Sequence, residues 1–469
     1  MKRHLILLLF LLLLMPLPVA AGETLTPDTF IFRGGSGRVT LSCAEVRMEE
    51  DVAYARICFD SPRYTRILLD GTEYPTQQEE TVSWAEIPAF LNRSFDIQAT
   101  TTAMSQPHDI TYTLYIGVDK LAGEEVPGLQ KLSVTVPQYA RGFTVDEYEN
   151  GLALIRITEG QRFLVVPEGQ PVPEGLHPDI RVLTLPLQNV YLAATSVMSL
   201  ADATGALDQI AFSSIRAEEW EIPAAREAME QDRIRFAGKY DAPDYELLVR
   251  EGCDLAIEST MIGHSPKIME MLELLGIPVW VDRSSYEPHP LGRTEWIRLY
   301  GILFGKRAEA DRFFEEQAAR VTELSVVSGD GGTVAFFYIN ANGAVVVRNV
   351  SDYIPEMIRM AGGTYVPEKA AAAGVTAASV TMSMESFYQE ASEADYLIYN
   401  AAIDAPLTSV SDLVARNSLF SSFKAVQSGQ VYCAQRRMYQ ATATVSDFIL
   451  DVRNMFEGQG EMTFLTQVR

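Results

Sequence analysis

The sequence predicts an α/β protein with two lobes built on parallel sheets, joined by one long backbone helix and preceded by a small all-β, sandwich-like domain. Three observations indicate this fold. Short alternating strands with almost no helical period fill the region from residue 25 to residue 136. Strands alternate with helices after residue 180 and again after residue 332, the pattern of a parallel sheet covered by helices. Between these halves, one stretch keeps a helical period.

The chain is long enough for this organisation, since it has 469 residues, of which 47% are hydrophobic. The stretch between the two α/β halves would form a rod of roughly 48 Å if it were one unbroken helix, which is long enough to join two lobes. We assign residues 1–21 to a signal peptide, 25–136 to an N-terminal β domain, 139–293 to the first lobe, 294–325 to the connecting helix and 326–460 to the second lobe.

The N-terminus has the pattern of a signal peptide: a basic start, a continuous apolar run and small residues that end at Ala21. We therefore expect export to the periplasm or to the outer face of the cytoplasmic membrane. The alternative is a retained anchor, because the run is just shorter than the roughly 20 residues that span a bilayer. No cysteine follows the run, so we expect no lipid anchor of the usual kind.

The formal net charge of −24 argues against nucleic acid as a partner, because phosphate binding needs basic surface. Four cysteines are too few for a disulfide scaffold. Cys43 and Cys58 nevertheless fall almost opposite each other across a predicted hairpin, and we expect that a disulfide can join them in an oxidising compartment. Cys253 and Cys433 have the pattern of small buried hydrophobic residues.

Several separate features of residues 139–460 resemble one known family, the periplasmic substrate-binding proteins of ABC importers for iron complexes, haem and cobalamin. They are RVLTLPL before a helix, the pair DYELLVREGCDLAIES and MSMESFYQEASEADYLIY, LGIPVWVD before a long helix, MIRMAGGTYV, and FKAVQSGQVY near the end. The resemblance implies a monomer that binds a small-molecule metal chelate and delivers it to an ABC permease and its ATPase. It also implies that Glu246 and Glu385, each at the start of a short helix, dock on permease arginines.

Ligands in such folds lie between the lobes, at the carboxyl ends of the strands. Tyrosine walls with a few arginines suit a large, flat or anionic metal complex. We expect no resident cofactor and no bare metal site. The predicted ligand-binding residues are Asn189, Tyr191, Tyr240, Met261, His264, Ser285, Tyr286, His289 and Arg293 from the first lobe, and Tyr338, Asn340, Arg348, Arg436 and Tyr439 from the second.

Two alternatives remain open at this stage. The stretch SSYEPHPLGRTEW, residues 284–296, holds Ser285, Glu287 and His289 and would suit an exported hydrolase, although residues so close in a Pro-rich loop rarely form a triad and no GxSxG elbow is present. Met104 or His108 of the β domain would suit axial haem ligands, which would make the chain a haem or metal relay. We expect a binding protein and no enzyme, with a ferric siderophore ahead of haem and cobalamin.

Overall fold

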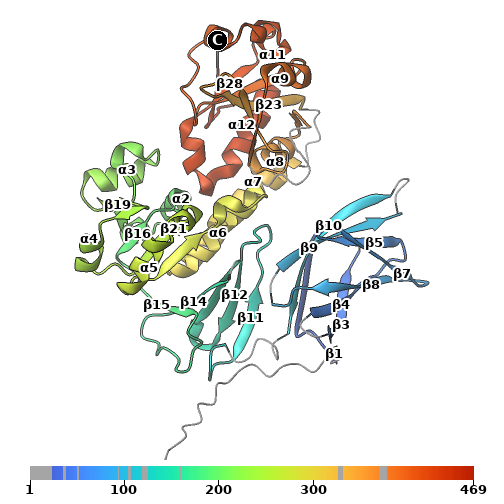
Figure 1. The fold of residues 1–469 in the computed structure, drawn as a ribbon, viewed down its shortest axis with the longest axis vertical. Helices are drawn as coiled ribbons and strands as arrows, with labels where there is room; N and C mark the ends of the chain where they lie inside the picture. The colour runs from blue at the N-terminus through green and yellow to red at the C-terminus, as the bar shows by residue number, and fades with distance from the viewer. Residues whose placement is uncertain are drawn as a thin grey trace, which may run out of the picture. The chain divides into compact units, whose positions relative to one another are not determined.

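The computed structural model of the chain divides into two compact units, Met1–Gln130 with Pro173–His177 as unit 1, and Lys131–Val172 with Pro178–Arg469 as unit 2 (Figure 1). The predicted signal peptide and Met104 lie outside the described residues. Among the helices that the structure describes, none is both long and apolar enough to cross a membrane. The described residues are 24–34, 39–49, 52–92, 94–103, 107–118, 125–158, 160–325, 331–368 and 378–469.

Unit 1 contains two five-stranded antiparallel sheets, with strand orders β1-β3-β4-β8-β7 and β2-β10-β9-β5-β6. Their facing sides share one core that includes Ile57, Phe59, Ile97 and Leu114, the arrangement of a β-sandwich. The strands are β1 (Thr24–Leu25), β2 (Thr29–Gly34), β3 (Leu41–Glu49), β4 (Val52–Phe59), β5 (Tyr64–Leu69), β6 (Thr72–Pro75), β7 (Gln77–Gln78), β8 (Ser83–Ala89), β9 (Ser94–Thr101) and β10 (His108–Gly117).

The expected disulfide between Cys43 and Cys58 is wrong. In the β3–β4 ladder Cys43 lies opposite Ile57, and Cys58 lies opposite Ser42. Because side chains alternate along a strand, this offset of one residue turns the two thiols to opposite faces of the sheet. Cys43 is buried in the core, Cys58 is half-buried on the other face, and both thiols are free.

Unit 2 begins with a five-stranded sheet of order β11-β12-β13-β14-β15, antiparallel except for the β14–β15 pair. Lys131–Thr135, which we expected at the end of the β domain, forms β11 and pairs with β12. RVLTLPL was expected as a strand of the parallel sheet of lobe 1, and this is also wrong. Its first residues belong to β15, which ends at Thr184 in the β11–β15 sheet, and the parallel sheet of lobe 1 begins with a separate strand at Val190. The strands are β11 (Lys131–Thr135), β12 (Phe143–Tyr148), β13 (Ala153–Ile157), β14 (Gln161–Val166) and β15 (Ile180–Thr184).

The first lobe holds a wholly parallel sheet of order β18-β17-β16-β21-β22. Residues of β21 alternate between two cores, with Leu255 and Ile257 in one and Ala256 in the other, so both faces are covered. Its strands are β16 (Val190–Leu192), β17 (Ile210–Ser213), β18 (Arg235–Phe236), β21 (Leu255–Ser259) and β22 (Val279–Asp282), with the small hairpin β19 (Gly238–Lys239) and β20 (Ala242–Pro243). Its helices are α2 (Thr195–Ala203), α3 (Pro223–Glu230), α4 (Tyr245–Arg250) and α5 (Pro266–Leu274).

The expectation of one long connecting helix is wrong. The segment forms two helices, α6 (Pro290–Leu303) and α7 (Arg307–Ser325). Gly305 lies between them with φ of +66°, a left-handed conformation that glycine adopts without strain and that ends helices. Helix α7 then folds back along α6, since Arg298 of α6 contacts Asp311 at 2.9 Å. A Cβ added at Gly301 would lie 2.5 Å from that of Ala310, so glycine allows this close approach.

The second lobe holds a mixed sheet of order β26-β24-β23-β27-β28-β29, with β25 also paired to β23. The pairs of β23 with β25 and β27, and of β27 with β28, are parallel as predicted, whereas β24, β26 and β29 are antiparallel. The strands are β23 (Thr333–Ile339), β24 (Val345–Arg348), β25 (Thr364–Val366), β26 (Ser379–Met382), β27 (Tyr396–Asn400), β28 (Val431–Ala434) and β29 (Leu465–Gln467). The helices are α8 (Tyr353–Met360), α9 (Met384–Ala391), α10 (Val410–Arg416), α11 (Lys424–Gln427) and α12 (Val445–Glu457).

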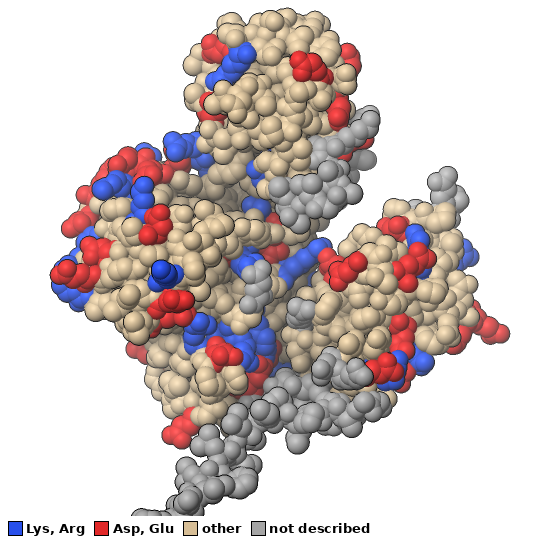
Figure 2. All heavy atoms as spheres, viewed as in Figure 1, with Lys and Arg blue, Asp and Glu red and all other residues tan. Residues whose placement is uncertain are grey.

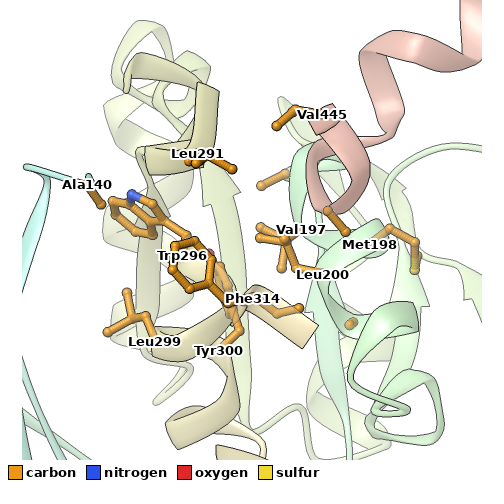
Figure 3. Close-up of a cluster of buried hydrophobic side chains, with 14 of the residues drawn as sticks. Ala140, Val197, Met198, Leu200, Leu291, Trp296, Leu299, Tyr300, Phe314 and Val445 are labelled. Atoms are coloured by element: carbon orange, nitrogen blue, oxygen red, sulfur yellow. The ribbon is translucent and has the colours of Figure 1, made fainter. Parts of the chain in front are cut away.

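One core runs through both lobes of unit 2 and joins them. It includes Trp296 and Tyr300 of α6, Phe314 of α7, Val197 of α2 and Val445 of α12 (Figure 3). Unit 2 also contains the single-turn helices η4 (Thr260–His264), η5 (Ser284–Tyr286), η7 (Arg436–Gln440) and η8 (Thr442–Thr444). Acidic and basic side chains are mixed over the face shown in Figure 2.

Candidate ligand site

A cavity of about 600 Å³ lies in unit 2 between the start of α6 and the second lobe. Its walls come from residues 285–288 and Arg293 on one side, from the segment between β24 and α8 on the other, and from η7 to α12. Five predicted ligand-binding residues line it, namely Ser285, Tyr286, Arg293, Arg348 and Tyr439. The volume suits a small-molecule ligand.

Arg293 is the central charged group of this cavity. Its Nε donates to the main-chain oxygen of Glu287 (3.0 Å), and its Nη2 donates to that of Ser285. Its guanidinium lies 3.5 Å from the ring centroid of Tyr353, the first residue of α8, so it bridges the two lobes by a cation–π contact. Burial lowers the pKa of Arg293, but an arginine stays charged at physiological pH.

The guanidinium of a second arginine, Arg348, lies 5.9 Å from the ring centroid of Tyr353. Its Nε and Nη2 donate to the two carboxylate oxygens of Asp352 at 2.9 and 2.7 Å, a bidentate pair. Burial lowers the pKa of Arg348, but the hydrogen bonds to Asp352 outweigh burial and the net pKa is raised. Asp352 also caps α8, because it accepts the N–H of Ile354 at 3.1 Å.

The two arginines that line the cavity therefore differ in whether a carboxylate pairs with them. Arg348 and Asp352 neutralise each other, whereas Arg293 has no carboxylate in ion-pair contact within the residues that the structure describes. Tyr439 completes the wall; its hydroxyl accepts a hydrogen bond from Asn400 (2.9 Å) and keeps its own proton, since burial raises the pKa of Tyr439. The cavity thus offers a buried guanidinium and a phenol donor, which suits an anionic group.

The first lobe contributes an exposed lip beside the cavity. Tyr286 is 66% exposed, and its hydroxyl accepts a hydrogen bond from Thr260 of η4 at 2.8 Å. Met261, the next residue of η4, is 46% exposed, and His264 at the end of η4 is also exposed. Met261 and His264 do not line the cavity, but they follow the carboxyl end of β21, as predicted.

Three predicted residues of the first lobe lie elsewhere. Asn189 precedes β16 and is therefore at its amino end, where its Nδ2 donates to the main-chain oxygen of Glu251 (3.1 Å). Tyr191 is buried within β16, and its hydroxyl donates to the main-chain oxygen of Gly238 (3.1 Å). Tyr240 packs against the core beneath α4. The predictions for Asn189 and Tyr191 assumed that both residues follow a strand formed by RVLTLPL. They failed because the first strand of the parallel sheet is β16, which starts at Val190.

Four more predicted residues also lie outside the cavity. His289 caps α6, since its Nδ1 accepts the N–H of Leu291 at 3.1 Å, and its ring stacks on Tyr139 at 4.7 Å. Asn340 closes a turn by accepting two main-chain N–H groups, and Tyr338 packs on the core of the second lobe. Arg436 lines a second cavity of about 730 Å³, at the carboxyl ends of β27 and β28.

Two buried glutamates of the 284–296 stretch, Glu287 and Glu295, accept hydrogen bonds from five consecutive main-chain N–H groups, a role that the sequence did not predict. Glu295 accepts those of residues 138, 139 and 140 at 2.6, 2.6 and 2.8 Å. Glu287 accepts those of residues 141 and 142, the shortest at 2.8 Å, and the indole N–H of Trp296 at 2.9 Å. Burial raises the pKa of Glu287, and these hydrogen bonds oppose that rise. We call residues 138–142 the clamped segment.

This arrangement leaves no catalytic triad. The carboxylate of Glu287 faces the clamped segment, His289 caps α6, and Ser285 gives its main-chain oxygen to Arg293. The described residues also contain no group of three or more His, Cys, Asp or Glu side chains that could hold a metal ion. His108, the described half of the haem hypothesis, is exposed at the start of β10.

Glu246 and Glu385 occupy matching positions in the two lobes. Each is the second residue of its helix, α4 or α9, after a capping side chain: Asp244 accepts the N–H of Leu247 at 3.0 Å, and Ser383 accepts that of Ser386 at 3.1 Å. Both glutamates are exposed. Each helix leads into the strand next to the first strand of its sheet, β21 or β27, so both glutamates lie at the carboxyl edges of the two sheets.

A wholly parallel sheet in the first lobe and a mixed sheet with a parallel centre in the second, joined through helices, agree with the fold of the periplasmic binding proteins. Unit 2 has this fold, as the resemblance in the sequence implied. A solved petrobactin-binding protein from Bacillus subtilis is 13% identical, covers 66% of this chain and 100% of its own, and superposes with a TM-score of 0.50. A periplasmic binding protein from Veillonella parvula is 15% identical, covers 58% of this chain and 92% of its own, and has a TM-score of 0.48.

Sequence comparison adds a relative of no assigned function. An uncharacterised lipoprotein of Methanocaldococcus jannaschii is 24% identical over 310 residues, which are 62% of this chain and 71% of the relative. No protein-family model matches the chain. These similarities concern the fold and do not identify the ligand.

Proposed function

We propose that this protein is the solute-binding component of an ABC importer and captures an anionic metal chelate, a ferric siderophore ahead of haem or cobalamin, in the cavity around Arg293. The protein is an exported one, as its apolar N-terminal run predicts and as its likeness to a lipoprotein and to periplasmic binding proteins indicates. The solved structures that the chain resembles are binding proteins and not enzymes, which supports a binding role.

The observation that carries the proposal is the charge of the cavity. Arg293 is buried, has its Nε and Nη2 held by main-chain oxygens, and has no carboxylate partner among the described residues. An unpaired charge in a partly desolvated site is costly, and an anionic ligand would relieve this cost. Catecholate and carboxylate chelates of iron carry the oxygen anions that a guanidinium binds best.

Aromatic side chains on both sides would hold the body of such a ligand. Tyr353 and Tyr439 belong to the second lobe, and exposed Tyr286 overhangs from the first. Because the common core fixes α6 against both lobes, the site needs little reorganisation when the ligand binds. Delivery would follow through Glu246 and Glu385, whose matching exposed positions suit two docking points on one permease.

A haem or metal relay through the β domain is the second candidate. It has weaker support, because His108 is exposed and Met104 lies outside the described residues. Absorbance after addition of haemin to the full-length protein separates the two candidates. A shift of the Soret band that His108→Ala abolishes would favour the relay.

The decisive experiment is a binding panel with the full-length protein. Ferric complexes of a tris-catecholate, of citrate and of a hydroxamate, together with haemin and cyanocobalamin, are titrated while intrinsic fluorescence is followed. Mass spectrometry of small molecules that co-purify from the native host runs in parallel. If none of the five complexes binds and no metal chelate co-purifies, the proposal is wrong.

A matched pair of variants tests the assigned residue. Arg293→Gln should weaken binding of the preferred anionic complex by about 10- to 100-fold, because a hydrogen bond to a charged group contributes roughly 1.5–3 kcal/mol. Arg437→Gln is the control, because Arg437 of η7 lies outside the cavity and donates to the main-chain oxygen of Thr463, so the affinity of this variant should stay within about twofold of the wild type. Equal affinities of both variants would rule out Arg293 as the anion-binding group.

A further inference from the structure

Glu258, near the carboxyl end of β21, is a buried acid to which the binding site assigns no role. Its exposed fraction is 0%, and neither carboxylate oxygen has a hydrogen-bond partner in the structure. Buried polar groups nearly always have partners. An acid without one, in the middle of a parallel sheet, needs a physical explanation.

The surroundings of Glu258 are apolar or acidic. Strand alternation places Glu258 on the same face as Ala256, the face covered by α4 and α5. The titratable groups that interact electrostatically with Glu258 or with its neighbour Tyr191 are all acids: Tyr191 itself from β16, Cys253 and Tyr245 from the ends of the α4 segment, and Asp241 from the hairpin before it. The side chains that α5 and β22 turn to this core are apolar, among them Leu272 and Val279. No cation of the described residues forms an ion pair with Glu258.

In such a site the neutral form of a carboxyl is strongly favoured, because an unpaired charge would lose its hydration. Burial raises the pKa of Glu258 to about 8. The neighbouring acids do not compete in that range, since burial raises the pKa of Cys253 to about 12 and also raises the pKa values of both tyrosines. Glu258 is therefore the group of this cluster that ionises in mildly alkaline solution.

We propose that Glu258 is a pH-sensitive positioning residue, whose protonated carboxyl lets α4 pack on the lobe 1 sheet and whose ionisation loosens α4. Leu248 of α4 belongs to the same core, and Tyr245 at its first turn interacts with the carboxyl. Exposed Glu246 is carried on that turn. Only the docking role of Glu246 rests on the proposed function. The effect of Glu258 ionisation on α4 requires no ligand, so a failure of this proposal is distinguishable from a failure of the binding proposal.

Hydrogen exchange of the α4 amides tests the coupling in the full-length protein. Exchange of a peptide that covers residues 245–252 is measured at pH 7 and pH 9.5 and corrected for the intrinsic pH dependence. For the wild type we expect protection to fall about tenfold or more between these pH values, and for Glu258→Gln we expect no fall. Glu270→Gln, which changes an exposed glutamate of α5, should behave like the wild type. Equal pH responses of the wild type and Glu258→Gln would overturn the proposal.

A second measurement uses the wild-type protein and tests the proposal even if Glu258→Gln does not fold. Carboxyl-labelled glutamate in the wild-type protein is titrated by carbon NMR between pH 4 and 10. One glutamate that ionises near pH 8, while the amide signals of α4 change with the same midpoint, supports the proposal. If every glutamate ionises below about pH 6, Glu258 is not a buried neutral acid and the proposal is wrong.

Discussion

The clamped segment gives the sharpest test of how the chain is held together. Glu295 is 0% exposed and is the acceptor for the N–H groups of residues 138, 139 and 140. Glu295→Ala leaves these three donors without an acceptor in a partly or fully buried setting. Each such group costs about 1–3 kcal/mol, so for three groups we expect a loss of roughly 3–9 kcal/mol in the free energy of unfolding of unit 2. That is a large share of a stability of about 5–15 kcal/mol.

Glu295→Gln keeps the shape but replaces one acceptor oxygen by an NH₂ group that faces an N–H donor. We expect roughly half of the effect of Glu295→Ala, about 1.5–4.5 kcal/mol. Glu315→Ala is the matched control: both glutamates contact Arg298, Glu295 at 3.7 Å and Glu315 at 3.4 Å, but Glu315 is largely exposed, so its loss should cost less than about 1 kcal/mol.

Urea denaturation followed by tryptophan fluorescence measures these changes. The fluorescence of Trp296 should respond directly, because its indole N–H donates to Glu287 and its ring lies beside Ala140 of the clamped segment (Figure 3). Hydrogen exchange of residues 138–142 supplies a local readout that does not depend on unit 1. If Glu295→Ala costs no more than Glu315→Ala, the clamped segment is not held by these carboxylates and our account of the 284–296 stretch fails.

Three further outcomes are expected. Burial lowers the pKa of His289 to about 4 from an ordinary value of 6.5, so the folded protein should lose stability as pH falls from about 6.5 to 4; thermal melts of His289→Asn, which keeps a capping oxygen, should be flatter in that range. Glu246→Ala combined with Glu385→Ala should leave ligand affinity within about twofold and abolish uptake in cells with the cognate permease; lost affinity would contradict the docking role. Thiol labelling after denaturation without reductant should find four free cysteines, and any lower number would contradict the register of β3 and β4.

The lobes were predictable because their elements follow strong local patterns. The alternation of β21, α5 and β22 appears in the sequence as apolar runs of strand length around a helix with an apolar stripe. The sequence did not predict which strands pair with each other or in which direction α7 runs. Lys131–Thr135 has the texture of the preceding strands, and only its ladder with β12 assigns it to unit 2. Gly305 was visible within the helical stretch, but one glycine does not reveal that α7 folds back along α6.

Site residues were predictable where they follow a strand of known direction. Arg348 ends β24 and Tyr439 follows β28, and both line the cavity. Asn189 failed because β16 starts just after it, which turns the supposed carboxyl end into an amino end. Asp352 and Tyr353 were missed, although a polar capping residue and an aromatic residue between a strand and a helix were a usable signal.

The first turns of α6 explain why the 284–296 stretch resembles an active site without being one. Because α6 begins at Pro290 and not at Thr294, Arg293 and Glu295 both lie within the helix. Two residues along a helix differ by about 200° around its axis, so these two side chains point to opposite sides. Arg293 therefore faces the cavity while Glu295 faces the clamped segment. One short turn of helix thus presents a cation to the ligand site and a carboxylate to the backbone that leads into β12, and any displacement of this turn must alter both contacts.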